Sequence, residues 1–354
     1  MNRPLLVNFS AISSDDRISI RASLTKSSVE LNSELKNEQS PIQSIRLFSK
    51  ELFRIKIIGF SADQDILYSK EFDSDNYGKF ELKIPRYLNQ QQITHLNIYE
   101  TRHIKGVEFH LGSFIPMAIS HPKKIIISDF DKTLVDTRYS TPKEMYYSLN
   151  KPLSYFPSVE KSITLLKSYI NQEFQPFILS ASPHFYENAI RNWLYQNEIY
   201  ASNIFLKDYR HFISLFDGLL TTKDIKKQGF YKLNQLVDIL LMCGFANEII
   251  LMGDGFESDP VIYLTLKRLC HPHSDPWKVW QSLKYQNIFN LTSKQDSHFI
   301  TKFYQLNELA KKNNLADIKI YIRSTKDNIQ NLKEKTFPSV ETTELNKTVE
   351  YYLA

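Results

Sequence analysis

Two aspartates separated by one residue, Asp129 and Asp131, stand directly after a short apolar run at residues 125–127. On an extended backbone, side chains at positions i and i+2 point to the same side. The two carboxylates would therefore repel each other unless a cation or a shared proton lay between them. With Thr133 as the next hydroxyl, this Asp-x-Asp-x-Thr pattern favours phosphoryl chemistry on a bound divalent ion. An acidic turn in which Thr133 caps a following helix is the alternative interpretation.

Two later apolar runs lead into polar residues of the same kind. One leads into Ser180 and Ser182, and the other ends just before Asp254 and Asp259. Parallel sheets place ligands just beyond the carboxyl ends of their strands, so we expect these side chains to gather at one edge. Structural roles remain as alternatives. Either serine could cap the next helix, since a proline follows Ser182, and Asp254 could belong to an acidic turn.

Hydrophobic patterning predicts the elements that position these residues. Residues 125–127 are β-branched without internal polarity, which is typical of a strand buried on both faces of a parallel sheet. After Pro122, strand-like runs alternate with helical segments, and this alternation predicts an α/β, doubly wound parallel sheet. The preceding segment carries short alternating runs without helical pattern, which predict an N-terminal β-sandwich. These runs lie at residues 18–24, 44–48, 53–58 and 95–99, and at the end of 73–85.

Composition sets the limits of these predictions. With 354 residues, of which 42% are hydrophobic, the chain is long enough for two domains with real cores. A formal net charge of +5 suits anionic substrates or membrane surfaces but is too weak to indicate nucleic acid. The two cysteines, Cys243 and Cys270, cannot build a disulfide framework or a thiolate metal site. We expect no convincing signal peptide and no membrane span, and therefore a cytoplasmic protein, with peripheral membrane contact as an option.

The ordered set of polar residues resembles the haloacid dehalogenase (HAD-like) phosphotransferases. The narrower motifs Ser-x-Ser-Pro, Phe-Leu-Lys-Asp, Lys-Leu-x-x-Leu and Gly-Asp-x-x-Glu-x-Asp-Pro-x-Ile-Tyr resemble the catalytic domain of the actin-patch-type phosphatidate phosphatase family. The resemblance covers roughly residues 40–324 and includes Ile-Tyr-Ile-Arg at 320–323. The chain departs from the pattern in three ways: Lys132 replaces a usual acid, Gly255-Phe256 replaces Ser-Gly, and residues 264–316 are inserted.

The resemblance implies a role for each carboxylate. Asp129 is expected to attack phosphorus and form an aspartyl phosphate. Asp131 is expected to protonate the leaving alkoxide and then to activate water. The implied cofactor is Mg²⁺, held by Asp129, the backbone carbonyl of Asp131 and Asp254. Asp259 belongs to the same metal site, where it would orient a metal-bound water or a lysine.

The hydroxyls and the lysine are expected to contact the phosphate. Ser180 would donate a hydrogen bond to a phosphoryl oxygen, and a lysine would offset the charge of the pentacoordinate state. Lys232 matches the Lys-Leu-x-x-Leu motif and is the predicted catalytic lysine, while Lys226 and Lys227 remain alternatives. The substrate-binding residues are predicted to be Thr133, Ser182 and Lys227.

These inferences predict a three-part chain. We expect a β-sandwich domain at residues 1–120, a HAD-like phosphatase domain at 121–330 with a helical insertion at about 264–316, and a polar tail at 331–354. In the insertion, Trp277, Trp280 and Leu283 recur at helical spacing and predict packing, with a membrane-facing stripe as the alternative. His271 and His273 lack a third ligand nearby, so we expect a polar loop there rather than a transition-metal site.

The predicted function is Mg²⁺-dependent hydrolysis of phosphatidate, or phosphatidic acid, to diacylglycerol. One alternative is a phosphatase that acts on a soluble phosphomonoester or a phosphoprotein. A second alternative is a non-catalytic module that binds lipid phosphate, although the presence of both Asp129 and Asp131 argues against it. The sequence does not identify protein partners.

Overall fold

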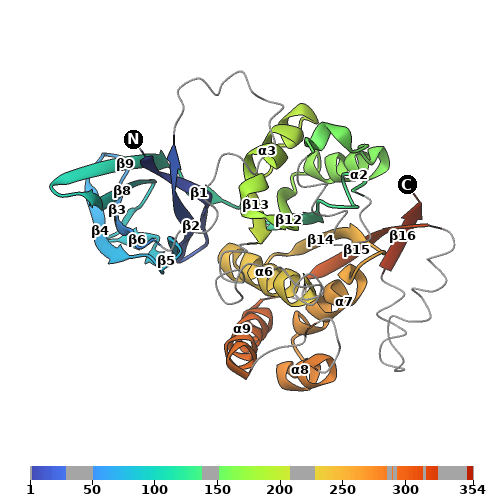
Figure 1. The fold of residues 1–354 in the computed structure, drawn as a ribbon. Helices are drawn as coiled ribbons and strands as arrows, with labels where there is room; N and C mark the ends of the chain where they lie inside the picture. The colour runs from blue at the N-terminus through green and yellow to red at the C-terminus, as the bar shows by residue number, and fades with distance from the viewer. Residues whose placement is uncertain are drawn as a thin grey trace.

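The N-terminal part of the chain is built from strands, and the rest is an α/β unit (Figure 1). The computed structural model describes residues 2–28, 51–137, 151–207, 228–284, 289, 293–313, 316–325 and 349–353.

Two four-stranded sheets make up most of the N-terminal part. The first has the order β10-β1-β2-β5 and the second the order β4-β3-β8-β9. Their bounds are β1 Asn2–Ser13, β2 Arg17–Ser28, β3 Arg54–Phe60, β4 Ile66–Asp73, β5 Lys79–Pro85, β8 His95–Ile104, β9 Val107–Phe114 and β10 Met117–Ala118. A short hairpin joins β6 (Tyr87–Leu88) to β7 (Gln91–Gln92).

An apolar core joins these two sheets. Alternate residues of a strand point to opposite faces, and here Ile18 and Ile20 of β2 belong to the same buried cluster as Ile55 and Ile57 of β3. The two-sheet arrangement expected from the alternating runs is therefore present. The run predicted at residues 44–48 lies outside the described residues.

A six-stranded parallel sheet forms the centre of the α/β unit. Its order is β13-β12-β11-β14-β15-β16, so β11, which ends at Asp129, lies inside the sheet. The strands are β11 Lys124–Asp129, β12 Gln175–Pro183, β13 Asn203–Lys207, β14 Glu248–Asp254, β15 Asp317–Ser324 and β16 Val349–Leu353.

Helices cover both faces of this sheet. Ile126 of β11 lies in the cluster that includes α2 (Glu160–Ile170) and α3 (Glu187–Gln196). Its neighbours Ile125 and Ile127 lie in the opposite cluster. That second cluster contains residues of α6 Gln228–Cys243, α7 Asp259–Leu269, α8 Pro276–Lys284 and α9 Ser293–Lys312. The short 3₁₀ turns η3 (Leu153–Tyr155) and η4 (His184–Tyr186) complete the described elements. The β-branched run is therefore buried on both faces, as expected.

The structure contains strands that hydrophobic patterning did not predict, among them β1, β4, β9 and β16. Strand β1 occupies the first residues of the chain, which mix polar and apolar residues. Strand β16 lies within the segment expected to be a polar tail, and it pairs with β15 in parallel.

The helices of the insertion pack against one another through Trp280. This side chain is fully buried, and its ring lies 5.2 Å from that of Phe299 and 5.8 Å from that of Phe303. Trp280 therefore packs in the core, whereas Trp277 is 47% exposed. Among the described residues, no helix is long and apolar enough to cross a membrane.

Candidate active site

The candidate site lies where the chain reverses its direction across the parallel sheet. Strands β11 and β14 are neighbours, yet β11 leads on to β12 on one side and β14 leads on to β15 on the other. Such a switch point leaves a crevice beyond the carboxyl ends of the two strands. Asp129 is the last residue of β11 and Asp254 is the last residue of β14.

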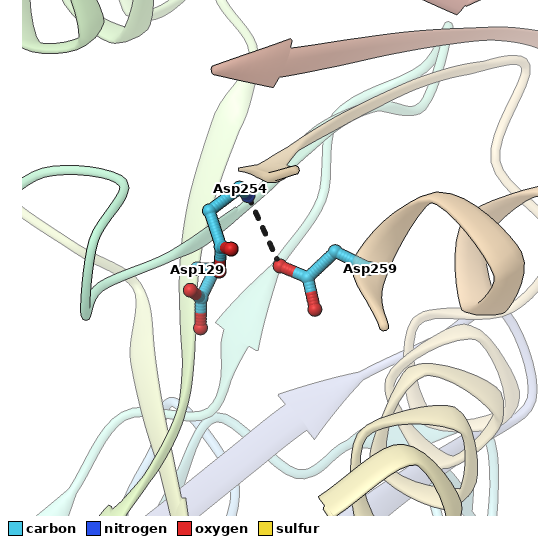
Figure 2. A group of neighbouring side chains, drawn as sticks. All are labelled: Asp129, Asp254 and Asp259. Carbon is cyan, nitrogen blue, oxygen red and sulfur yellow. Dashed lines mark hydrogen bonds between the residues drawn. The ribbon is translucent and has the colours of Figure 1, made fainter. Parts of the chain in front are cut away.

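Three aspartates gather beyond the ends of these two strands (Figure 2). Oxygen atoms of Asp129, Asp254 and Asp259 all lie within 4.8 Å of one another, and each residue is at most 1% exposed. Asp259 comes from the first turn of α7, and its Oδ2 accepts a hydrogen bond from the backbone N–H of Asp254 at 3.3 Å. The fold thus buries three carboxyl groups side by side.

Burial disfavours the charge on each of these carboxyls. It raises the pKa of Asp129 well above its usual value, and the charges of Asp259 and Asp254 raise it further while Lys232 opposes the shift. Burial also raises the pKa of Asp259. For Asp254, burial together with the charges of Asp259 and Glu257 raises the pKa to about 8. A group that supplies positive charge would relieve this arrangement.

The donor atoms of the cluster fit a hard divalent cation. Oδ2 of Asp254 is buried and accepts no hydrogen bond from the residues that the structure describes. Oδ1 of Asp129 likewise accepts no hydrogen bond from them, although Nζ of Lys232 lies 3.1 Å away as an ion-pair partner. Carboxylate oxygens are the ligands that Mg²⁺ prefers. Asp129, Asp254 and Asp259 could therefore hold such an ion.

Lys232 on α6 lies among the carboxylates. Its Nζ is 2.6 Å from Oδ1 of Asp259, 3.1 Å from Oδ1 of Asp129 and 3.8 Å from Oε2 of Glu257, and the residue is 1% exposed. Burial lowers the pKa of Lys232, but the carboxylates of Asp129 and Asp259 outweigh it and hold that pKa well above the usual value. The lysine is therefore charged at neutral pH. Lys226 and Lys227, the other predicted lysines, lie outside the described residues.

The carboxylate of Asp131 is not a member of the three-aspartate cluster and accepts hydrogen bonds from hydroxyl groups. Its Oδ2 accepts hydrogen bonds from Oγ of Ser180 at 2.7 Å and from Oγ of Ser182 at 2.6 Å. Its Oδ1 accepts one from Oγ1 of Thr137 at 3.2 Å. The hydroxyls of Ser180 and Ser182 thus both contact Asp131, and their contact with the phosphate stays a prediction. Thr133 donates to Oδ2 of Asp129 at 3.3 Å.

Sequence reasoning gave no role to two charged residues beside the site, Arg323 and Glu257. Arg323, the penultimate residue of β15, donates to the backbone carbonyl of Lys132 at 2.6 Å and to Oδ1 of Asp136 at 3.2 Å. Glu257 lies 2.8 Å from Nζ of Lys132 and also faces Lys232. The position of Arg323, a cation at the carboxyl end of a buried strand, could have indicated from the sequence that it lies near the site. The contacts of Glu257 depend on the loop after β14 and carried no such signal.

Among the described residues, no His-containing group could hold a metal ion, and the three aspartates are the one candidate cluster. The rings of His271 and His273 lie 5.6 Å apart in a turn between α7 and α8. The loop expected at these residues is therefore present.

Part of the α/β unit matches a family model. Residues 124–274 match the family model described as phosphatidate phosphatase APP1, catalytic domain. The enzymes of this family are phosphoric monoester hydrolases. The matched range includes all three aspartates of the cluster together with Asp131, and it ends inside the helical insertion. No curated protein matches the chain.

Solved structures resemble the chain only weakly. A calcium-binding mutant of Bacteroides uniformis beta-glucuronidase 2 is 11% identical, with a TM-score of 0.27 over 98% of this chain and 36% of that one. Ruminococcus gnavus beta-glucuronidase is 6% identical, with a TM-score of 0.25 over 100% of this chain and 54% of that one. A carbohydrate esterase is 10% identical, with a TM-score of 0.22 over 99% of this chain and 88% of that one. The chain spans about a third to a half of these glucuronidases, and the likeness carries no argument.

Proposed function

We propose that this chain, whose residues 124–274 belong to the phosphatidate phosphatase APP1 catalytic-domain family, is a HAD-like, Mg²⁺-dependent phosphatase that hydrolyses phosphatidate to diacylglycerol. The observation that carries the proposal is the position of Asp129. Its carboxylate ends a buried central strand, faces the charged Lys232 at 3.1 Å and adjoins two further buried carboxyls. Structural acids are rarely buried in such a group, because the cost of desolvating them is not recovered.

The first chemical step joins Asp129 to the phosphoryl group. A carboxylate oxygen of Asp129 attacks phosphorus, and the bond from phosphorus to the glycerol oxygen breaks. The leaving oxygen takes a proton from the carboxyl group of Asp131, so that diacylglycerol leaves as a neutral alcohol. The hydroxyls of Ser180 and Ser182, both donating to Oδ2 of Asp131, orient that group.

The second step restores the enzyme. Asp131, now ionised, takes a proton from a water molecule that attacks phosphorus, and the bond to Asp129 breaks to release inorganic phosphate. Lys232 lies between Asp129 and Asp259 in the resting site, where its fixed charge can also offset the negative charge that develops on the phosphoryl oxygens. Asp259, at 2.6 Å, fixes the position of the Lys232 ammonium group.

The metal site of this proposal comprises Asp129, Asp254 and Asp259, with the backbone of Asp131 as a further candidate. A bound Mg²⁺ would supply positive charge that neutralises the carboxylates and polarises the phosphoryl group. Oδ2 of Asp254 is the oxygen most clearly available to it, since this buried atom accepts no hydrogen bond from the described residues.

Phosphate release from phosphatidate in mixed micelles tests the proposal directly. The wild-type protein is assayed with Mg²⁺ and with EDTA, beside a panel of soluble phosphomonoesters. Asp129→Asn should abolish turnover, because an amide cannot form the acyl phosphate. The matched control is Asp317→Asn, at the opposite end of the same sheet and largely exposed, and it should retain wild-type turnover.

The possible results separate the competing functions. Metal-dependent release from phosphatidate supports the lipid phosphatase. Release from soluble esters alone would keep the chemistry and reject the lipid substrate. Turnover by the folded Asp129→Asn variant would reject this residue as the nucleophile, and a wild-type protein that binds phosphatidate micelles without any turnover would favour the binding-module alternative.

A further inference from the structure

Phe256 is a large apolar side chain exposed in the loop of the candidate site. It lies two residues after Asp254 and is 46% exposed. The backbone N–H groups of Phe256 and Glu257 donate to Oδ1 of Asp254 at 2.6 and 2.8 Å. The ring is therefore attached directly to a segment that contacts one of the three buried carboxyls.

The loop holds the ring in a defined place. The backbone N–H of Gly255 donates to the carbonyl of Arg323 at 2.8 Å, which ties the loop to β15. The guanidinium carbon of Arg323 lies 5.9 Å from the centroid of the Phe256 ring, within reach of a cation–π interaction. An exposed side chain that is already oriented loses little conformational entropy when a ligand covers it.

The fold itself does not need this phenyl ring. The hydrogen bonds of the loop come from backbone groups, which any residue except proline could supply at position 256. The ring also belongs to none of the apolar clusters formed by the described residues. Single exposed aromatic rings are common on protein surfaces. What distinguishes Phe256 is its position two residues after Asp254, in the loop whose backbone N–H groups bind that carboxylate.

The surroundings define the chemistry of that ligand. Glu257, the residue after Phe256, lies 3.8 Å from Nζ of Lys232. The same Nζ also contacts Asp129 and Asp259. In the proposed function this is where the phosphoryl group reacts. The ring itself offers an apolar surface beside this polar centre. A ligand that binds both the charged centre and the apolar ring would carry a phosphomonoester group attached to an apolar moiety.

We propose that Phe256, which stands where the resembled phosphatidate phosphatases have glycine, contacts the acyl-bearing part of phosphatidate next to its phosphoryl group and so raises the specificity of this chain for the lipid over soluble esters. This inference rests on the proposed function. Because the ring touches the non-reacting part of the substrate in both the bound state and the transition state, its removal raises KM for phosphatidate more than it lowers kcat.

The experiment compares kcat/KM for phosphatidate in mixed micelles with kcat/KM for glycerol 3-phosphate, both with saturating Mg²⁺. In Phe256→Ser the ratio of the two values should fall at least tenfold, mainly through KM for phosphatidate. Phe256→Trp should restore most of the ratio, because it returns an aromatic surface. The matched control is Trp277→Ser in α8, which removes a comparably exposed ring (47%) from the insertion and should leave the ratio unchanged.

The outcomes distinguish this inference from the proposed function. If the wild-type protein hydrolyses phosphatidate and Phe256→Ser keeps the ratio within twofold, the inference is overturned and the proposed function stands. An equal fall in Trp277→Ser would also overturn it, since the effect would not be specific to the site. If the wild-type protein does not hydrolyse phosphatidate, the proposed function fails and this inference fails with it.

Discussion

The two oxygens of Asp254 have very different surroundings. Oδ1 accepts two backbone hydrogen bonds, whereas Oδ2 accepts none from the described residues. With a pKa raised to about 8, chiefly by burial, this carboxyl holds its proton up to mildly alkaline pH in the metal-free protein. A cation that binds here must therefore displace a proton.

The stability of the metal-free protein should consequently fall as pH rises from about 5 to 8. The unfolded chain releases the Asp254 proton near its ordinary pKa of about 4, while the folded protein keeps it until about pH 8. Between these values the folded state binds more protons, so each rise in pH favours unfolding. Thermal unfolding in EDTA at pH 5, 6, 7 and 8 measures this dependence, and added Mg²⁺ should raise Tm most at pH 8.

The control for this prediction is Asp254→Asn, which removes the titrating group. The variant should show a smaller loss of Tm between pH 5 and 8 and a smaller stabilisation by Mg²⁺. Asp129 and Asp259 also have raised pKa values, so part of the pH dependence should remain. A wild-type Tm that stays level across this range in EDTA would contradict the proposed state of the site.

At the scale of elements, β15 holds the loop that follows β11. Arg323 near the end of β15 donates to the backbone carbonyl of Lys132 and forms an ion pair with Asp136. The side chain of Arg323 is only 8% exposed. Lys132 adopts a left-handed backbone with φ of 60°, a conformation that costs a non-glycine residue about 1 kcal/mol or more. The guanidinium thus supports a strained turn that contains Asp131.

Arg323→Ala should therefore reduce both activity and stability. Loss of a mostly buried ion-pair partner should lower the free energy of unfolding by about 3 kcal/mol. Displacement of the Asp131 loop should lower kcat by about 10- to 100-fold. Arg323→Lys should recover only part of the loss, because an ammonium cannot reproduce the paired N–H groups. Urea unfolding and steady-state kinetics measure the two effects, and an unchanged kcat in a folded Arg323→Ala protein would exclude the positioning role.

The contrast between Asp129 and Arg323 shows how far the sequence alone could predict the site. Asp129 follows a run of β-branched residues, and this local pattern is enough to place it at a strand end. The contact of Arg323 with Lys132 joins positions 191 residues apart, and no local pattern records such a pairing. The same holds for Ser180 and Ser182. Their position at this edge of the sheet was predicted, but their hydrogen bonds to Asp131 depend on the conformation of the turn after β11, which the sequence did not predict.

The unpredicted strands have a related cause. Strand β1 mixes polar and apolar residues, yet Ile12 is fully buried because it meets the α/β unit as well as its own sheet. Strand β16 has the composition of an ordinary strand, Val-Glu-Tyr-Tyr-Leu, but it follows a long polar segment. It is ordered by pairing with β15 and by side-chain contacts such as that of Tyr352 with Ser162 at 2.8 Å. No local pattern in either strand records these tertiary contacts.

At the scale of the whole molecule, the N-terminal part is joined to the α/β unit by a shared apolar core. Ile12 of β1 and Ile119 belong to the same buried cluster as Ile125 of β11. Polar contacts accompany this core, because Arg21 of β2 donates to the side chain of Gln235 on α6, the helix that carries Lys232. The N-terminal sheets therefore contact and support α6, the helix that positions the proposed catalytic lysine.

The shared core predicts that the two parts unfold together. Ile12→Ala should lower the free energy of unfolding by about 2–5 kcal/mol, the usual cost of a cavity at a buried isoleucine. It should also move a single calorimetric transition to lower temperature, with enzymatic activity lost over the same range. Ile115→Ala, at a side chain that is 84% exposed, should leave the transition in place. Two separate transitions, of which Ile12→Ala shifts only one, would contradict this prediction. The N-terminal sheets and the α/β unit would then be stable independently, and the contacts of Ile12 with the α/β unit would contribute little to stability.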